Sequence, residues 1–160
     1  MSDLKEALTS LDLTNITTYI QSGNVLFDTK SPNELNLEER IKDLIYVNFG
    51  FDVPVIIREK QEFLQLINNC PFEIDAISLK QVHVTFLSAV PQEEQVNELK
   101  SAVPENEELI FLNDNFILKC GDRYSQAKLN NGFIERKLKV TATTRNWKTI
   151  LKLKELACER

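Results

Sequence analysis

The sequence has few of the residues that bind metals or form cross-links. It contains a single histidine and three cysteines, at positions 70, 120 and 158, with no Cys-x-x-Cys pair. Structural zinc sites use closely spaced cysteine and histidine ligands, so this set excludes one. The cysteines are expected to be reduced and mostly buried, as in a reducing compartment. We expect neither a metal nor a cofactor.

Long apolar segments are also missing. The best run, residues 53–57, is interrupted by Pro54 and falls far short of the roughly 18 residues of a membrane-spanning helix. The first residues form an acidic amphipathic stretch rather than the basic and then apolar start of a secretory signal. The sequence therefore predicts a cytoplasmic protein with no membrane contact. It also contains no recognisable catalytic motif, so whether the protein is an enzyme stays open.

What the chain does have is a strong separation of charge. Residues 119–160 contain 11 Lys and Arg against 4 Asp and Glu, a net charge of +7, whereas residues 1–118 carry −12, within an overall −5. A basic segment of this kind attracts anions. The last third is therefore where an anionic ligand is expected.

The second half of the chain has a readable order of elements. Residues 81–87 alternate apolar and polar side chains, as a strand does, and residues 91–103 have the pattern of a helix that begins with proline and acids. Residues 108–120 read as a hairpin around Asn113 and Asp114. A helix over 125–138, a strand over 140–144 and a helix over 147–158 follow. This order predicts a split βαβ, ferredoxin-like half with an extra helix.

The first half repeats that order from its first helix onward. We predict a helix over 3–11 with Ser2 as its cap, a hairpin formed by 15–20 and 24–28, a helix over 34–49 ended by Gly50, a strand over 52–57 and a helix over 59–69. The opening strand of this half is missing. We therefore expect about 15 to 20 further residues upstream, the length of one strand and its loop.

Together these patterns predict an α+β protein of two ferredoxin-like halves with antiparallel sheets. The predicted domains are residues 1–70, lacking the first strand, and residues 71–160, which include the C-terminal helix.

Three stretches of the chain resemble a known bacterial family, domain of unknown function 1697. They are TYIQSGNV at 18–25, FDVPVI at 51–56, and the segments KLN, FIERKL and ATTRNW between 128 and 147. Members of that family usually begin with a strand and a glycine-rich loop, which this chain lacks, so it is similar to a member shortened at its N-terminus. The resemblance implies an α+β fold with ferredoxin-like halves and no established reaction.

Two candidate anion sites lie in the basic segment. If 125–138 is one helix, Lys128, Arg136 and Lys139 form a stripe on one face, with Gly132 leaving that face open. The alternative is a solvated row of charges. The second candidate is the junction Thr143, Thr144, Arg145 and Asn146, where a strand passes into a helix and free N–H groups can bind an anion. The alternative is that Thr144 or Asn146 caps the helix while Trp147 anchors it in the core.

A small-molecule site is the other option. The hairpin residues Tyr19, Gln21, Ser22 and Asn24 offer hydroxyl and amide groups, although the turn itself accounts for them. With Tyr124 and Arg145 they form an enzyme-like site if the two halves bring them together. A Cys120–His83 pair is the weakest candidate, because alternation places the two side chains on different faces, as a core thiol and a surface imidazole.

The preferred reading is a non-catalytic module that binds an anionic small molecule or phosphate. The alternatives are a small-molecule enzyme and a charge-driven interaction module that self-associates. Nucleic acid is disfavoured, because the strands present no exposed aromatic pair for stacking and the overall charge is negative.

Overall fold

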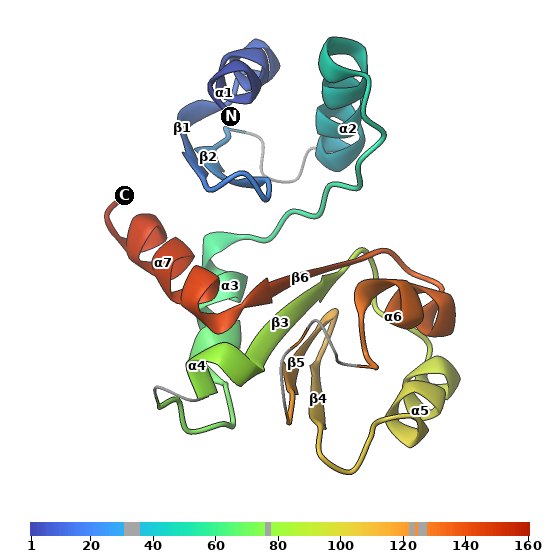
Figure 1. Ribbon diagram of the computed structural model, residues 1–160. Helices are drawn as coiled ribbons and strands as arrows, with labels where there is room; N and C mark the ends of the chain where they lie inside the picture. The colour runs from blue at the N-terminus through green and yellow to red at the C-terminus, as the bar shows by residue number, and fades with distance from the viewer. Residues whose placement is uncertain (31–35, 76–77, 122–123, 125–127) are drawn as a thin grey trace. The chain divides into compact units, whose positions relative to one another are not determined.

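The computed structural model describes residues 1–30, 36–75, 78–121, 124 and 128–160 (Figure 1). The chain forms two compact units. Unit 1 contains Met1–Ile57 and Leu156–Arg160, and unit 2 contains Arg58–Glu155. The division thus falls at Ile57, whereas the sequence repeat predicts one at residue 70. The protein is a mixed α+β structure with two antiparallel sheets.

Unit 1 is a two-stranded hairpin with two helices. It consists of α1 (Ser2–Leu8), a 3-10 turn (Thr9–Leu11), β1 (Thr14–Tyr19), β2 (Asn24–Asp28) and α2 (Leu37–Phe49). Gly23 adopts a φ of 81° in the turn between the strands, and Gly50 ends α2 with a φ of 74°. Left-handed backbone of this kind favours glycine, so the hairpin and the end of α2 are confirmed. The residues predicted to begin α2, 31–35, lie outside the described residues, and the predicted Ser2 cap on α1 is wrong because Ser2 is already helical.

The predicted strand over residues 52–57 is also wrong. These residues form no regular element and pair with no strand in the described part of the chain. Pro54 lacks a backbone donor, and the Ile57 N–H donates to Glu38 Oε1 at 2.6 Å. Val55 and Ile57 nevertheless pack against the core of unit 1, which is formed by Leu8, Leu13, Ile16, Leu37 and Ile41.

Unit 2 contains a four-stranded antiparallel sheet. Its helices and strands are α3 (Lys60–Asn68), α4 (Ser78–Gln81), β3 (Val82–Leu87), α5 (Glu93–Ser101), β4 (Glu108–Leu112), β5 (Asn115–Lys119), α6 (Asn131–Leu138), β6 (Ala142–Asn146) and α7 (Trp147–Cys158). The strand order is β4-β5-β3-β6. The predicted hairpin around Asn113 is confirmed, and Asn113 has a φ of 58°.

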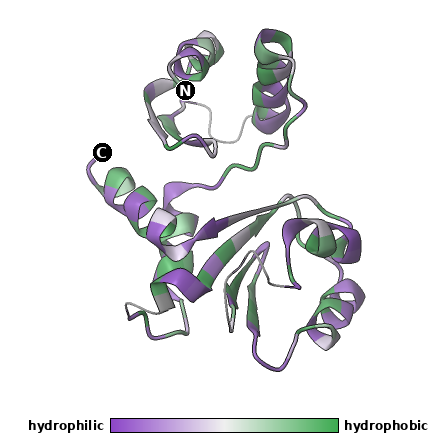
Figure 2. Cartoon of the chain, viewed as in Figure 1, coloured by the Kyte–Doolittle hydropathy of each residue, from purple (hydrophilic) through white to green (hydrophobic). Residues whose placement is uncertain are grey.

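Both faces of this sheet are covered, because all six residues of β3 are buried. On one face, Phe116 and Leu118 of β5 pack with Leu99 of α5 and with Ile134 and Leu138 of α6. Figure 1 shows α5 and α6 together beside this face. Figure 2 shows apolar residues on β3 and β5, and hydrophilic residues along much of α5. On the other face, the Phe86 ring stacks on Phe63 of α3, with ring centroids 6.3 Å apart.

Arg58 fixes the turn between β4 and β5. Its guanidinium donates to Leu87 O at 2.6 Å and to Asn115 Oδ1 and Asp114 O at 3.1 Å each. It also pairs with the Asp114 carboxylate at 2.9 Å. Arg58 is partly buried, and by joining the end of β3 to the β4–β5 hairpin it stabilises this corner of the sheet.

Candidate functional site

Lys128 and Arg136 meet at the ring of Phe133. The Lys128 Nζ atom lies 5.9 Å from the ring centroid, and the Arg136 Cζ atom lies 5.5 Å from it. The predicted helical stripe is wrong, because α6 begins only at Asn131 and Lys128 precedes it. Asn130 is the N-cap, and its Oδ1 accepts from the Phe133 N–H at 3.0 Å. Two of the predicted cations are therefore brought together by cation–π contacts, not by helical spacing.

Arg136 also lines a groove between α5 and α6. The groove has a volume of about 350 Å³ and is lined by Gln92, Glu94, Gln95, Glu98, Arg136, Lys137 and Lys139. Lys139, the third predicted cation, is not helical. It ends α6 with a φ of 55° and has an exposed side chain. The groove therefore combines three cations with two amides and two carboxylates.

The cations of the groove differ in their pairing. Lys137 Nζ lies 3.4 Å from Glu98 Oε2 across the groove. Among the described residues, no carboxylate oxygen lies within 4.0 Å of a side-chain nitrogen of Arg136 or Lys139. The first turn of α5 is capped, since the Gln92 N–H donates to Gln95 Oε1 at 3.2 Å. The groove thus presents two cations that have no carboxylate partner among the described residues. Both lie at the C-terminal end of α6, where the negative end of the helix dipole stabilises positive charge.

Tyr124 and Thr144 belong to a second, partly buried cluster at the start of α6. Thr144 Oγ1 donates to Asn131 Oδ1 at 2.6 Å, and Tyr124 OH donates to the same oxygen at 3.2 Å. The hydroxyls of Thr85 and Thr144 are 2.8 Å apart. Because the Thr144 proton is already donated, Thr85 is the donor of that pair. Burial raises the pKa of Tyr124, so its hydroxyl stays protonated as this network requires.

His83 extends this cluster and corrects the sequence interpretation. It is only 6% exposed, its ring stacks on Tyr124 with centroids 4.5 Å apart, and its Nδ1 donates to Gln81 O at 3.0 Å. Burial lowers the pKa of His83, so the neutral ring keeps its lone pair on Nε2. Tyr124 also packs on the core that contains Cys120, so His83 and Cys120 share a face. The predicted surface imidazole is wrong.

Cys120 is nevertheless an inert thiol. Burial, with the Glu107 carboxylate nearby, raises the pKa of Cys120 to about 12. A thiol of that pKa carries almost no thiolate at neutral pH, which a nucleophile needs. The predicted core thiol is confirmed, whereas Cys158 is exposed.

The junction from Thr143 to Asn146 has its own internal partners. Asn146 Oδ1 accepts from the Thr149 N–H at 2.8 Å, and Trp147 is 3% exposed, so the capping alternative is confirmed. Arg145 donates to Thr143 Oγ1 at 2.8 Å and to Thr144 O at 2.9 Å. Successive strand residues point to opposite faces, so Arg145 lies on the face away from α6 and apart from Lys128 and Arg136.

The hairpin candidates lie in unit 1. Asn24 is buried, and its amide donates to Tyr19 O at 3.2 Å and to Ser22 Oγ at 2.9 Å. Gln21 and Ser22 are exposed. These bonds close the turn, as turn chemistry alone requires. A site that joins these residues with Tyr124 and Arg145 stays a prediction.

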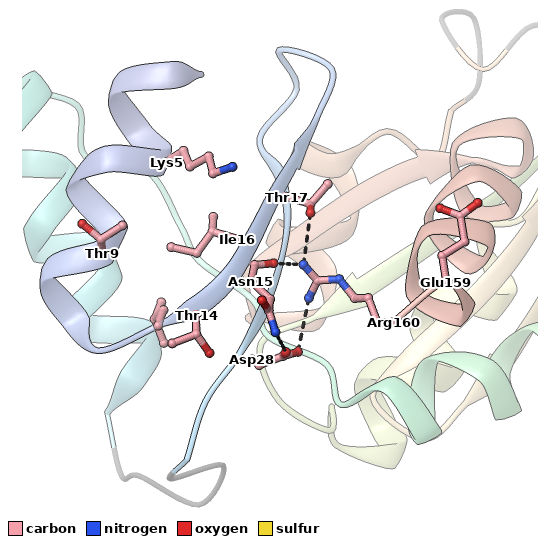
Figure 3. Close-up of a pocket in the computed structure, with 10 residues that line it drawn as sticks. Lys5, Thr9, Thr14, Asn15, Ile16, Thr17, Asp28, Glu159 and Arg160 are labelled. Atoms are coloured by element: carbon pink, nitrogen blue, oxygen red, sulfur yellow. Dashed lines mark hydrogen bonds and ion pairs between the residues drawn. The ribbon is translucent and has the colours of Figure 1, made fainter.

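Sequence reasoning missed a polar pocket in unit 1 (Figure 3). It has a volume of about 760 Å³ and is lined by residues of α1, β1, β2 and the chain end, among them Lys5, Thr9, Asp28 and Arg160. Arg160 donates to Asn15 O, to Thr17 Oγ1 at 3.1 Å and to Asp28 Oδ1 at 3.3 Å. Asn15 has a φ of 51° at an irregularity in the β1–β2 register. The only sequence signal for this irregularity is an asparagine within the predicted strand, because asparagine tolerates left-handed backbone.

A family model of proteins of unknown function, DUF1697, matches residues 1–116. The chain belongs to this family. The DUF1697 match ends within β5, so Lys128, Phe133 and Arg136 lie beyond it. Among solved structures, the chain is similar to a conserved bacterial protein, SP0830 from Streptococcus pneumoniae, with a TM-score of 0.72 and 22% identity. That likeness covers 98% of this chain and 88% of the other and concerns the fold. A search of curated proteins found no match.

Two further findings limit the chemistry of the described residues. No helix among them is long and apolar enough to cross a membrane. Within the same part of the chain, no group of three or more His, Cys, Asp or Glu side chains is arranged to hold a metal ion.

Proposed function

We propose that this DUF1697 protein is a non-catalytic module that binds a small anion, such as phosphate or a phosphorylated ligand, in the groove between α5 and α6. The observation that supports it is the pair of cations, Arg136 and Lys139, that line the groove without a carboxylate partner among the described residues. Phe133 supports the Arg136 guanidinium from one side. Gln92 and Gln95 add amide groups that can donate to phosphate oxygens.

The expected affinity is modest. Hydrogen bonds to charged groups contribute roughly 1.5 to 3 kcal/mol each, so two of them give about 3 to 6 kcal/mol, a Kd of roughly 40 µM to 6 mM. The Glu94 and Glu98 carboxylates line the same groove and oppose an anion. We therefore expect the weaker part of this range for inorganic phosphate and the tighter part for a ligand that also contacts the amides.

Titration with phosphate at constant ionic strength, followed by amide NMR shifts, tests the proposal. Shifts should concentrate on α6 and the first turn of α5, and both Arg136→Gln and Lys139→Gln should weaken binding. Lys148→Gln is the matched control, because it removes one exposed charge from α7 in the same unit. Equal weakening by all three variants would show a general charge effect and reject the groove as the site.

Three finer points are part of the same proposal. We place the protein in the cytoplasm. We interpret unit 2 as a split βαβ, ferredoxin-like half, on the support of the strand order β4-β5-β3-β6 with α5 after β3 and α6 after β5. Unit 2 carries 14 Lys and Arg against 14 Asp and Glu. This neutral balance favours a small ligand over nucleic acid, which selects basic domains.

A further inference from the structure

The groove between α5 and α6 carries unpaired charge of both signs. Its α6 wall supplies the two cations of the proposed function, Arg136 and Lys139. On the α5 wall, Glu98 Oε2 lies 3.4 Å from Lys137 Nζ, so this carboxylate is paired. Glu94 is exposed on the same wall and forms no ion pair with any described residue. An anion bound at the two cations leaves the charge of Glu94 without a partner.

The position of Glu94 on α5 places its carboxylate within reach of the same ligand. Glu94 and Glu98 are four residues apart, so they share one face of the helix and lie about 6 Å apart along its axis. The Glu98–Lys137 pair spans the groove, so Glu94 lies about one helical turn from a point where the two walls meet. The groove volume of about 350 Å³ is at the lower end of the range for small-molecule sites, roughly 300 to 1,000 Å³. A small ligand can therefore contact both walls at once.

The three unpaired charges differ in what they attract. Arg136 and Lys139 together match a dianion, which a phosphate monoester is near neutral pH. The carboxylate of Glu94 repels that dianion but attracts an ammonium group. A ligand that carries both groups gains from each wall, whereas a plain anion gains from one and is opposed by the other.

We propose that the ligand of the groove is a zwitterion, a phosphate monoester with a primary ammonium group on a short chain. Its phosphate contacts Arg136 and Lys139, and its ammonium group pairs with Glu94. This inference rests on the proposed function and adds to it the chemical class of the ligand. Exposed ion pairs of this kind change an affinity by about two- to fivefold, which sets the expected preference for the zwitterion.

Two probes that differ only in the ammonium group test the proposal, 2-aminoethyl phosphate and ethyl phosphate. Both are titrated into the full chain at constant ionic strength and about pH 8, where phosphate monoesters, with a second pKa of about 6, are dianions. Amide NMR shifts give the two Kd values. We expect 2-aminoethyl phosphate to bind about two- to fivefold more tightly. A general positive field would give the opposite order, because ethyl phosphate has the larger net negative charge.

Two matched variants assign the preference to one carboxylate. Glu94→Gln should abolish the preference and strengthen the binding of ethyl phosphate, because the repelling charge is removed. Glu93→Gln is the control, since Glu93 is also an exposed acid in the first turn of α5 but does not line the groove. It makes the same change of charge at the same helix end and should keep the preference.

The possible failures of this inference and of the proposed function are distinct. Ethyl phosphate that shifts α6 and the first turn of α5, without tighter binding of 2-aminoethyl phosphate, would overturn the zwitterion and leave the anion site standing. A preference that survives Glu94→Gln, or that Glu93→Gln removes equally, would overturn the role of Glu94. No shifts in the groove with either probe at about 20 mM, above the Kd range expected for the site, would reject the proposed function and this inference with it.

Discussion

Gly121, which follows β5, gives the sharpest stability prediction. A Cβ atom at this position would lie 2.6 Å from both Asn106 Nδ2 and Asn106 O, and 3.0 Å from Asn106 Cβ. The side-chain amide can rotate away, but the carbonyl oxygen belongs to the backbone, so relief requires a shift of the chain. Overpacking of this kind costs typically 1 to 3 kcal/mol. Gly121→Ala should therefore destabilise unit 2 by about that amount.

Gly132 is the matched control, because glycine-to-alanine substitution there should increase stability instead of lowering it. It is the second residue of α6, has an exposed position, and its added Cβ would meet only Asn130 Oδ1, at 3.6 Å. That distance is an ordinary contact. Replacing a helical glycine by alanine where there is space stabilises by about 0.4 to 1 kcal/mol, mainly by restricting the unfolded chain.

Urea unfolding followed by tryptophan fluorescence measures both variants. Trp147 is the only tryptophan and is buried in unit 2, so its emission reports on this unit. With a urea slope of roughly 1 to 3 kcal/mol/M, the Gly121→Ala midpoint should fall by about 1 M. Adding Asn106→Ala to the Gly121→Ala protein should recover only part of the lost stability, because the backbone carbonyl of residue 106 stays in place. A Gly121→Ala protein as stable as the parent would refute the steric reasoning.

Three other substitutions or titrations test single contacts. Arg58→Ala should lower the free energy of unfolding by about 2 to 4 kcal/mol, and Arg58→Lys by less, because the alanine leaves backbone carbonyls and Asp114 unpaired. The pKa of His83, the only histidine, should lie below its ordinary value of about 6.5 when measured by NMR. The unfolded chain then takes up the proton first as the pH falls, so the free energy of unfolding should decrease below about pH 6.5. His83→Phe should reduce this pH dependence of the free energy of unfolding. Cys158 should react with a thiol reagent in the native protein, while Cys120 should react only on unfolding, as mass spectrometry of the labelled peptides would show. Each prediction has an outcome that would contradict it. These outcomes are a fast reaction of Cys120 in the native protein, a His83 pKa above 6.5, and an Arg58→Ala protein with an unchanged free energy of unfolding.

Local turn and cap chemistry made much of the fold predictable. Both hairpins form where Gly23 and Asn113 allow left-handed backbone, and α2 ends at Gly50. The helix over Trp147–Cys158 has the predicted bounds. These features depend on a few neighbouring residues, so the local sequence is enough to predict them.

The start of α6 could not be located in the same way. Residues 125–138 have a helical pattern, yet Asn130 supplies an N-cap and the helix begins one residue later. Asparagine competes for helix interiors by bonding to nearby backbone N–H groups, so it ends or begins a helix more readily than it continues one. The predicted stripe assumed a helix to which neither Lys128 nor Lys139 belongs.

Alternation failed for β3 because the sheet is covered on both sides. A strand with one solvent-facing side shows polar residues on that side, so alternation predicts that His83 and Thr85 face solvent. In the structure these two side chains are buried, Thr85 within a hydroxyl network and His83 against Tyr124. Polar residues whose hydrogen bonds are made within such a network can lie in a core. Alternation of polar and apolar residues therefore does not by itself show which face of a strand is exposed to solvent.

The basic tail has a different meaning once the chain is folded. Its +7 lies almost entirely in unit 2, where acids from residues 58–118 bring the unit to neutrality, and unit 1 carries the whole net charge of −5. Charges beyond about 10 Å are screened at 0.1 M salt, so the sum over the tail cannot attract a ligand at physiological ionic strength. The proposed function therefore depends on the two cations that line the groove, Arg136 and Lys139. Under the proposed function a compact anion is the expected ligand, because a long polyanion would also meet the carboxylates of Glu94 and Glu98 in the groove.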